Sequence, residues 1–205
     1  MSDLYVGLIH APLYALGPGT RVGLWLAGCR RRCPGCLSPD FFDVKPEQKI
    51  DPLELAGQIL FLAKKMGLKA LTVSGGEPFE RAENLGILLE KLRGEGIRDV
   101  LAYTGFEAAG LLAEFPWVPE LVSALVDGPF DLNEPSQEIF RGSRGQKLFI
   151  FDPSLDPMYS GWSKQTKRQA QFLLERGRIR ILGVPAIGDY EKAFAAADEA
   201  NDLSV

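Results

Sequence analysis

Three cysteines carry the clearest chemical signal in this chain. Cys29, Cys33 and Cys36 lie within eight residues in a C-x3-C-x2-C spacing, and the chain has no other cysteine. They follow an apolar, strand-like run at residues 22–27. Thiolates are soft ligands that suit zinc and iron–sulfur clusters. The spacing therefore predicts a metal-binding loop that follows a strand.

The spacing leaves three interpretations of this loop open. A [4Fe–4S] cluster normally takes four cysteines, so three would leave one iron open to another molecule. Zinc needs a fourth ligand, usually cysteine or histidine, and the only histidine, His10, lies far upstream. The third interpretation is a set of unligated thiols or a redox pair. The cluster is favoured, because Gly28, Pro34 and Gly35 let the backbone fold tightly around an inorganic core.

A second motif, Gly75-Gly76-Glu77-Pro78, follows another apolar run at residues 68–74. Two glycines allow a ligand to approach the backbone closely. Free carbonyl groups there, or the Glu77 carboxylate, can accept hydrogen bonds from an ammonium group. Alone, the motif is weak evidence for a site, because the same four residues also make an ordinary turn.

The elements that must position these motifs alternate along the chain. Strands are predicted at residues 22–27, 68–74, 99–103, 121–126, 147–151 and 178–182, and helices at residues 51–67, 82–93, 106–115, 164–176 and 190–200. Strands joined by helices imply parallel pairing with right-handed crossovers. The predicted fold class is α/β, a partial (β/α)6-like barrel of parallel strands with helices outside and the cluster loop after the first strand.

One domain is expected over residues 1–205, with a core at residues 17–151 and a C-terminal βα extension at residues 152–205. The formal net charge of −4 and the pI of about 5.2 do not support broad nucleic-acid binding. No apolar run reaches the roughly 18–20 residues that span a bilayer. The first residues lack the basic start of a signal peptide, and clustered, odd-numbered cysteines favour a reducing compartment. A cytoplasmic protein without membrane or nucleic-acid partners is expected.

Together, the cysteine motif and the Gly75–Pro78 motif resemble the radical S-adenosylmethionine (SAM) superfamily. Within it, the chain is most similar to the small activases of glycyl-radical enzymes, especially the anaerobic ribonucleotide reductase activase branch. The similarity covers roughly residues 17–150 and includes Gly17-Pro18-Gly19-Thr20-Arg21, Leu24-Trp25, Tyr103-Thr104-Gly105-Phe106, Val126-Asp127-Gly128-Pro129-Phe130, and Arg141-Gly142-Ser143 with Gln146. The chain departs from the activase pattern at Leu37-Ser38 and at Gly145.

The resemblance implies a [4Fe–4S] cluster and SAM as cofactors. Cys29, Cys33 and Cys36 would hold three irons, and the fourth iron would bind the amino and carboxylate groups of SAM. Gly75, Gly76 and Glu77 would receive the amino group. One-electron reduction would cleave SAM into methionine and a 5′-deoxyadenosyl radical, and that radical would take a hydrogen atom, in an activase from a glycine Cα. The protein positions these cofactors and excludes water.

Three further residues are candidates for binding SAM. Thr104 and Asp127 follow successive predicted strands, and in barrels the loops after the strands gather at the face where sites are built. Either could contact the ribose or the methionine part of SAM; equally, Thr104 could belong to a turn and Asp127 could cap a helix. Arg141 could pair with a carboxylate in a bidentate way, or be a structural or solvated arginine.

The implied partners are a glycyl-radical enzyme as protein substrate and an electron donor of the flavodoxin or ferredoxin type. Arg30-Arg31-Arg32, inside the cysteine loop, is either a solvated stretch or a patch that steers an acidic partner to the cluster. Two other functions stay open. One is a small radical SAM enzyme that acts on a metabolite, a base precursor or a peptide. The other is a non-catalytic iron–sulfur electron-transfer or binding module, although a pure electron carrier needs no open iron.

Overall fold

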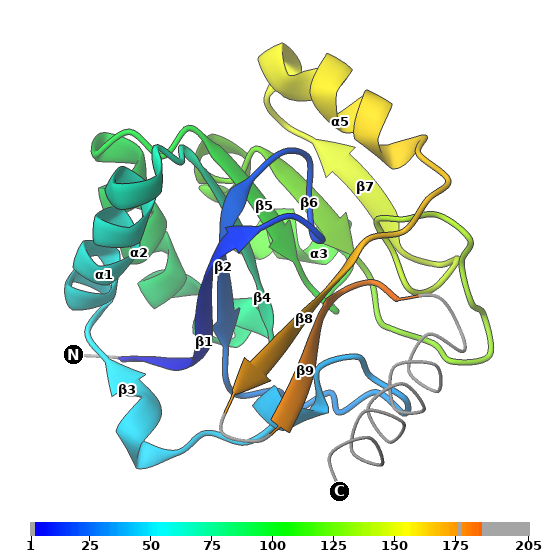
Figure 1. Ribbon diagram of the computed structural model, residues 1–205, viewed down its shortest axis with the longest axis horizontal. Helices are drawn as coiled ribbons and strands as arrows, with labels where there is room; N and C mark the ends of the chain where they lie inside the picture. The colour runs from blue at the N-terminus through cyan, green and yellow to red at the C-terminus, as the bar shows by residue number, and fades with distance from the viewer. Residues whose placement is uncertain (1–2, 176–177, 186–205) are drawn as a thin grey trace, which may run out of the picture.

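A computed structural model of the chain describes residues 3–175 and 178–185, and a seven-stranded sheet forms its centre (Figure 1). The strand order is β3-β1-β2-β4-β5-β6-β7. The sheet strands are β1 (Leu4–Leu13), β2 (Arg21–Leu26), β3 (Lys49–Ile50), β4 (Ala70–Gly75), β5 (Asp99–Tyr103), β6 (Ala124–Asp127) and β7 (Lys147–Ile150). Strands β2, β4, β5 and β6 pair in parallel, whereas β1, β3 and β7 join antiparallel at the two sides.

Helices connect the parallel strands, as right-handed crossovers require. The α-helices are α1 (Pro52–Met66), α2 (Ala82–Gly94), α3 (Ala108–Glu114), α4 (Val118–Leu121) and α5 (Asp156–Ser163). Short 3-10 turns are η1 (Pro39–Phe41), η2 (Pro46–Gln48), η3 (Pro78–Arg81) and η4 (Pro153–Leu155). A separate hairpin consists of β8 (Ala170–Glu175) and β9 (Arg178–Gly183).

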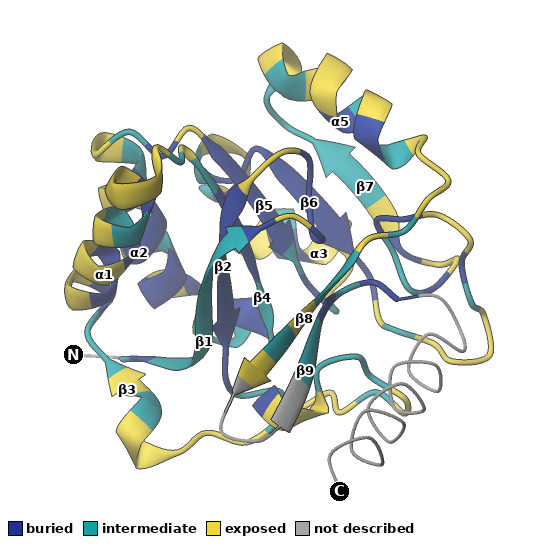
Figure 2. Cartoon of the chain, in the orientation of Figure 1, coloured by how far each residue is buried: buried dark blue, intermediate teal, exposed yellow. Residues whose placement is uncertain are grey.

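Successive side chains of a strand point to opposite faces of the sheet, so both faces have apolar side chains to bury. Helices pack against both faces. Apolar residues of α1, α2, α3 and α4 pack on one face, against side chains such as Leu24, Val73 and Leu125. On the other face, Tyr159 and Trp162 of α5 pack against β5 and β6. Figure 2 shows the buried residues concentrated in the central strands between these two layers.

Local sequence signals explain α1 well. The Asp51 carboxylate accepts hydrogen bonds from the backbone N–H groups of Leu53 and Glu54, and Pro52 occupies the first helical position. Gly67 ends the helix in the left-handed conformation, with φ of 66°. The predicted helix at residues 51–67 is confirmed, as are the helices predicted at residues 82–93 and 106–115.

The α/β class and a mostly parallel central sheet are confirmed, but the prediction that all six strands run parallel is wrong. Strand β7 runs antiparallel to β6, and β9 pairs antiparallel with β8 outside the main sheet. The segment between β6 and β7, residues 128–146, contains no crossover helix, so the chain can return antiparallel. Strand β1 was not predicted, and the cysteine loop therefore follows the second strand, β2.

The C-terminal part also differs from the prediction. The helix predicted at residues 164–176 is wrong, because residues 170–175 form β8; α5 lies earlier, at residues 156–163. The strand predicted at residues 178–182 is confirmed as β9. The helix predicted at residues 190–200 lies outside the described residues.

Candidate active site

The cysteine loop is held in place by the backbone at the end of β2. The N–H groups of Gly28 and Cys29 donate to the carbonyl oxygens of Phe41 and Phe42, both over 2.9 Å, so the loop closes on the turn that follows it. Cys29, Cys33 and Cys36 are free thiols, partly buried, and all three line one pocket of about 140 Å³. The structure therefore brings the three predicted ligands to one place.

The chemistry of these donors fits an iron–sulfur cluster. The Cys36 sulfur accepts a hydrogen bond from the Ser38 N–H over 3.4 Å, the kind of contact that tunes cluster thiolates. Burial raises the pKa of the Cys36 thiol, the Ser38 N–H lowers it, and the neighbouring Cys33 and Cys29 raise it further. Among the described residues, no three His, Cys, Asp or Glu side chains are grouped to hold a single metal ion. A [4Fe–4S] cluster does not need such convergence, since each thiolate binds a different iron.

Gly75 and Gly76 are required first by packing. A Cβ atom on Gly75 would lie 2.2 Å from the Leu26 carbonyl oxygen, and one on Gly76 would lie 2.3 Å from that of Gly28. The Gly76 N–H donates to Leu26 over 2.7 Å, and the Glu77 N–H donates to Gly28 over 2.8 Å. The two glycines thus allow the backbone of Leu26 and Gly28 to approach closely, where a close approach by a ligand was expected. Both glycines also line the pocket.

The Glu77 carboxylate joins the ends of β4 and β5. It accepts hydrogen bonds from the Thr104 hydroxyl (2.8 Å), the Gly105 N–H (2.6 Å) and the Phe79 N–H (3.1 Å). Burial raises the pKa of Glu77, although these three bonds and the charge of Arg31 act in the opposite direction. Glu77 and Thr104 both line the pocket, and the hydrogen bond between them stabilises its wall.

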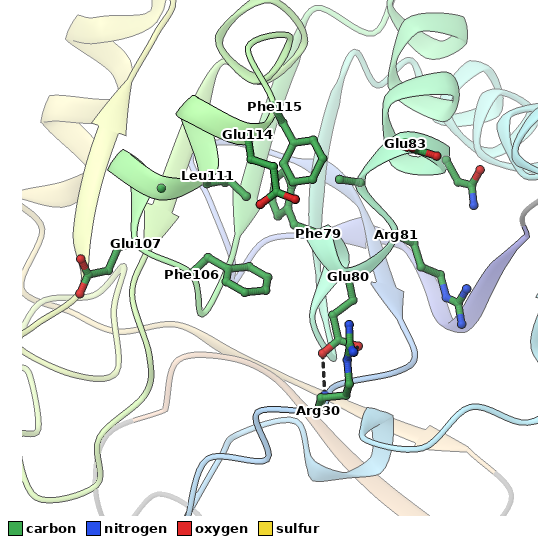
Figure 3. A pocket seen from close by; sticks show the side chains of 13 residues that line it. Arg30, Phe79, Glu80, Arg81, Glu83, Phe106, Glu107, Leu111, Glu114 and Phe115 are labelled. Atoms are coloured by element: carbon green, nitrogen blue, oxygen red, sulfur yellow. Dashed lines mark hydrogen bonds and ion pairs between the residues drawn. The ribbon is translucent and has the colours of Figure 1, made fainter.

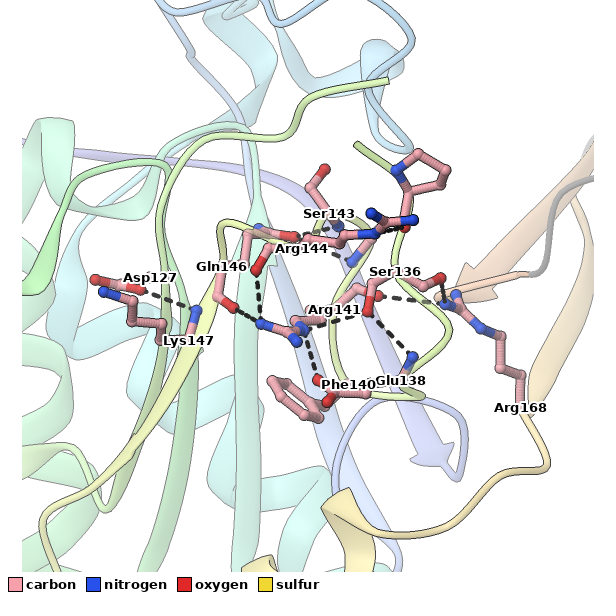
Figure 4. A network of polar contacts seen from close by, with 12 residues as sticks. Asp127, Ser136, Glu138, Phe140, Arg141, Ser143, Arg144, Gln146, Lys147 and Arg168 are labelled. Carbon is pink, nitrogen blue, oxygen red and sulfur yellow. Dashed lines mark hydrogen bonds and ion pairs between the residues drawn. The ribbon is translucent and has the colours of Figure 1, made fainter. Parts of the chain in front are cut away.

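Asp127 and Arg141 do not line this pocket. The two Asp127 oxygens accept from the Ala108 N–H at the start of α3 (2.8 Å) and from the Lys147 N–H of β7 (3.1 Å). Figure 4 shows Arg141 inside the loop between β6 and β7. Its guanidinium donates to the carbonyl oxygens of Arg144 and Gln146 and pairs with Glu138. Both residues organise backbone, which favours the structural alternative for each.

Sequence reasoning did not propose several residues that line the pocket. The Gln146 amide accepts from the Gly142 and Ser143 N–H groups, both over 3.0 Å, and donates to the Gly128 carbonyl over 3.1 Å. Its place in the family motif at residues 141–146 was the sequence feature that could have identified Gln146 as a site residue. The other additional lining residues are Leu16, Trp25, Arg31, Leu37, Ser38, Phe42, Ser74, Tyr103, Gly105, Gly128, Phe130, Gly142, Ile181, Gly183 and Val184.

The three consecutive arginines separate in space. Arg30 is largely exposed and pairs with Glu80, whereas Arg32 pairs with Asp43. Arg31 lines the pocket, and its guanidinium lies 5.4 Å from the centre of the Phe106 ring. Their side chains thus have different partners, although all three residues are exposed beside the cysteine loop.

A larger cavity, of about 610 Å³, is lined by a different set of residues (Figure 3). Its lining comes from the cysteine loop, η3, the start of α2 and α3, and includes Arg30, Phe79, Phe106, Leu111 and Phe115. No cysteine borders it. Donor chemistry rather than size therefore identifies the smaller pocket as the candidate active site.

The fold and the site define a class: an α/β protein with a three-cysteine loop at the carboxyl ends of parallel strands. The family model described as "4Fe-4S single cluster domain" matches residues 15–149. The anaerobic ribonucleoside-triphosphate reductase-activating protein of Escherichia coli strain K12 is 33% identical over 137 residues, which cover 63% of this chain and 88% of that protein.

Two other relatives show how far the similarity extends. The protein of the same name from Enterobacteria phage T4 is 25% identical over 141 residues, covering 65% of this chain and 85% of the relative. The pyruvate formate-lyase-activating enzyme of Staphylococcus epidermidis is 34% identical over 87 residues, covering 40% of this chain and 34% of the relative.

The chain belongs to the 4Fe-4S single cluster domain family and, within it, to the radical SAM activating enzymes. The resemblance predicted from the sequence is confirmed, and with it a [4Fe–4S] cluster and SAM as cofactors. The zinc and unligated-thiol interpretations of the cysteine loop are set aside for that reason. Across residues 3–175 and 178–185, no helix is long and apolar enough to cross a membrane.

Proposed function

We propose that this enzyme activates an anaerobic ribonucleoside-triphosphate reductase by taking a hydrogen atom from a glycine Cα of that partner. The relatives' names and the 88% coverage of the Escherichia coli protein support this assignment. The observation that carries it is the single pocket into which the three thiols, Gly75, Gly76 and Glu77 all face.

Each predicted site residue has a specific role in this proposal. Cys29, Cys33 and Cys36 each hold one iron through a thiolate. When bound, the cluster and SAM would supply the chemistry: one-electron reduction would cleave SAM to methionine and a 5′-deoxyadenosyl radical, which would take the glycine hydrogen and leave as 5′-deoxyadenosine. The pocket's apolar lining, including Trp25 and Phe130, keeps water from that radical.

The strand ends position SAM. Backbone carbonyl groups at Gly75 and Gly76 receive its amino group, and the Glu77 carboxylate fixes their conformation while contributing negative charge. Thr104 acts through its hydrogen bond to Glu77. We also propose that the parallel strands curve around the pocket as part of a (β/α) barrel, because their carboxyl ends meet there, as in barrel sites.

The remaining assignments follow from charge and compartment. A flavodoxin-like or ferredoxin-like donor supplies the electron, and the exposed Arg30 next to Cys29 is a point of attraction for its acidic surface. A cytoplasmic location suits three clustered thiols, which a reducing compartment keeps free. Residues 1–205 act as one domain, in which the segment after residue 151 completes the site.

Anaerobic reconstitution followed by product analysis tests the proposal. The protein should hold about four irons per chain and show iron–sulfur absorbance. After reduction it should convert SAM to 5′-deoxyadenosine, and with the reductase of the same organism it should produce an organic radical signal that shifts on α-deuteration of glycine. Zinc without iron would contradict the ligand assignment. Release of 5′-deoxyadenosine without any radical on the reductase would point instead to a metabolite or peptide substrate.

A further inference from the structure

The β8–β9 hairpin lies beyond the region that the family model matches, which ends at residue 149. It nevertheless contributes Ile181 and Gly183 to the active-site pocket, and the next residue, Val184, also lines it. The matched part of the Escherichia coli relative accounts for 88% of that protein but only 63% of this chain. This wall of the site is therefore an addition to the shared activase core.

The inner face of the hairpin is firmly attached to that core. Leu182 is 2% exposed and belongs to a cluster with Leu13, Trp25 and Phe41. The Gln171 amide accepts from the Tyr14 N–H over 2.5 Å and donates to the Pro12 carbonyl over 3.0 Å. These contacts hold the hairpin in a fixed position beside the pocket.

The outer face of the hairpin is apolar and exposed. Phe172 is 59% exposed and Leu174 is 74% exposed, and they occupy alternate positions of β8. Ile181 lies opposite Phe172 in the pairing register, so its side chain shares that face, and it also lines the pocket. Phe172, Leu174 and Ile181, here called the hairpin strip, thus run from the pocket outward.

An exposed apolar strip of this kind indicates a binding site for another chain. Proteins usually protect edge strands with charges, and adjoining exposed apolar side chains mark interaction sites. Within the described residues, β8 and β9 pair only with each other, so each has a free edge that could pair with an extended chain. Strand addition of this kind combines backbone hydrogen bonds with contacts to alternate side chains.

We propose that the hairpin strip binds an extended apolar segment of the glycyl-radical partner, next to the glycine that enters the pocket. The inference rests on the proposed function, in which the partner's glycine enters the pocket that Ile181 lines. The strip begins at Ile181 in the pocket and continues outward, so the segment that delivers a glycine to the cofactors lies across Phe172 and Leu174. The hairpin therefore determines which partner this activase recognises, while the shared core carries out the chemistry.

The test compares two double variants of the full chain, each reconstituted with its cluster. Phe172→Ser with Leu174→Ser removes the strip. The control, Leu53→Ser with Phe61→Ser, removes side chains on α1 that are 55% and 67% exposed and lie outside the pocket. The probe is the reductase of the same organism. The strip variant should bind it at least about tenfold more weakly, equal to roughly 1.4 kcal/mol, with a matching rise in its KM. The control should bind like the wild type.

Iron content and 5′-deoxyadenosine release without the reductase separate this inference from the proposed function. Both should be unchanged in both variants. Equal reductase affinity in all three proteins would overturn the strip as a partner site. So would a change in oligomeric state of the strip variant, which would assign the strip to a second copy. A gain in reductase affinity on removing residues 186–205 would assign it to this chain's own C-terminal segment. Failure of the wild type to release 5′-deoxyadenosine would instead contradict the proposed function.

Discussion

Glu77 shows how a single buried carboxylate sets the geometry of the pocket. It is 5% exposed, and its two oxygens serve three donors from two different segments, of which the shortest contact is 2.6 Å to the Gly105 N–H. An ionised carboxylate is acceptor-only, so it suits a site at which only donors converge. The carboxylate therefore fixes the distance between the loops that follow β4 and β5.

Replacing Glu77 with alanine should destabilise the protein and weaken SAM binding together. The Gly105 and Phe79 N–H groups would lose their acceptor, and each buried unsatisfied donor costs about 1–3 kcal/mol. Glu77→Gln keeps one acceptor oxygen and should lose less stability. Urea unfolding under anaerobic conditions and SAM titration measure the two effects. Unchanged stability of Glu77→Ala would show that the three contacts do not matter for the fold.

Asp127 should affect stability without affecting SAM affinity. Asp127→Asn leaves one acceptor for two backbone donors, at Ala108 and Lys147, so a loss of about 1–3 kcal/mol is expected in urea unfolding. Asp152→Asn is a matched control, because Asp152 caps only the short turn η4 at the surface. A large rise in the Kd for SAM in Asp127→Asn would restore the role in cofactor binding that the sequence suggested.

The sequence predicted which residues lie at strand ends but not where their side chains point. The cysteines and the Gly75–Glu77 motif could be located because short-range spacing carries their chemistry. Asp127 follows its strand as predicted, yet its carboxylate turns toward α3 and β7 rather than the pocket. Such orientation depends on backbone N–H groups that are 19 and 20 residues away, and local patterns do not encode them.

At the scale of elements, the residues that mark helix ends predicted α1 correctly, whereas the composition of residues 170–175 favoured a helix where β8 forms. Asp51, Pro52 and Gly67 define the ends of α1 locally. Residues 170–175 contain Gln, Leu and Glu, which favour helices in isolation. Pairing with β9 and packing of Leu182 onto the core override that preference. The direction of β7 has the same kind of origin, because strand pairing is decided by partners distant in sequence.

A buried network connects α5 to the opposite ends of the strands. Arg21 is fully buried and donates to Thr72 (2.8 Å) and to Asp99 (2.5 Å), while the Tyr159 hydroxyl of α5 donates to Asp99 over 2.6 Å. Burial raises the pKa of Tyr159, which therefore stays protonated as a donor. The network joins β2, β4 and β5 to a helix outside the matched region.

Breaking the charge pair in this network should be much more costly than removing one hydroxyl. Asp99→Asn leaves the Arg21 guanidinium buried without its carboxylate, a change that typically costs about 3–5 kcal/mol. Tyr159→Phe removes one buried donor and should cost about 1–2 kcal/mol. Urea unfolding measures both, with Tyr14→Phe at a 49% exposed tyrosine as control. Similar losses in Asp99→Asn and Tyr159→Phe would mean that the charge pair adds little beyond its hydrogen bonds.

For the whole molecule, the question is whether the segment after residue 151 is an appendage or part of the domain. Tyr159 is fully buried and Trp162 is 8% exposed in a cluster with β5 and β6. Leu182 and Val184 belong to a different cluster, beside the cysteine loop. The two parts of this segment therefore cover different regions of the core, as expected if the described residues after 151 belong to the same domain as the core.

Two truncations should separate these contributions. A chain that ends at residue 163 retains α5 and should lose chiefly the hairpin wall, with weaker reductase binding and modest loss of stability. A chain that ends at residue 151 also lacks Tyr159 and Trp162. Without them, the Arg21–Asp99 pair loses a hydrogen-bond partner, and an apolar face of the core is exposed. Burying a large aromatic side chain contributes roughly 1.5–3 kcal/mol, so the shorter chain should unfold at clearly lower urea concentration. Equal unfolding midpoints for the full chain and residues 1–151 would show that the core folds independently and that the C-terminal segment is a separate unit.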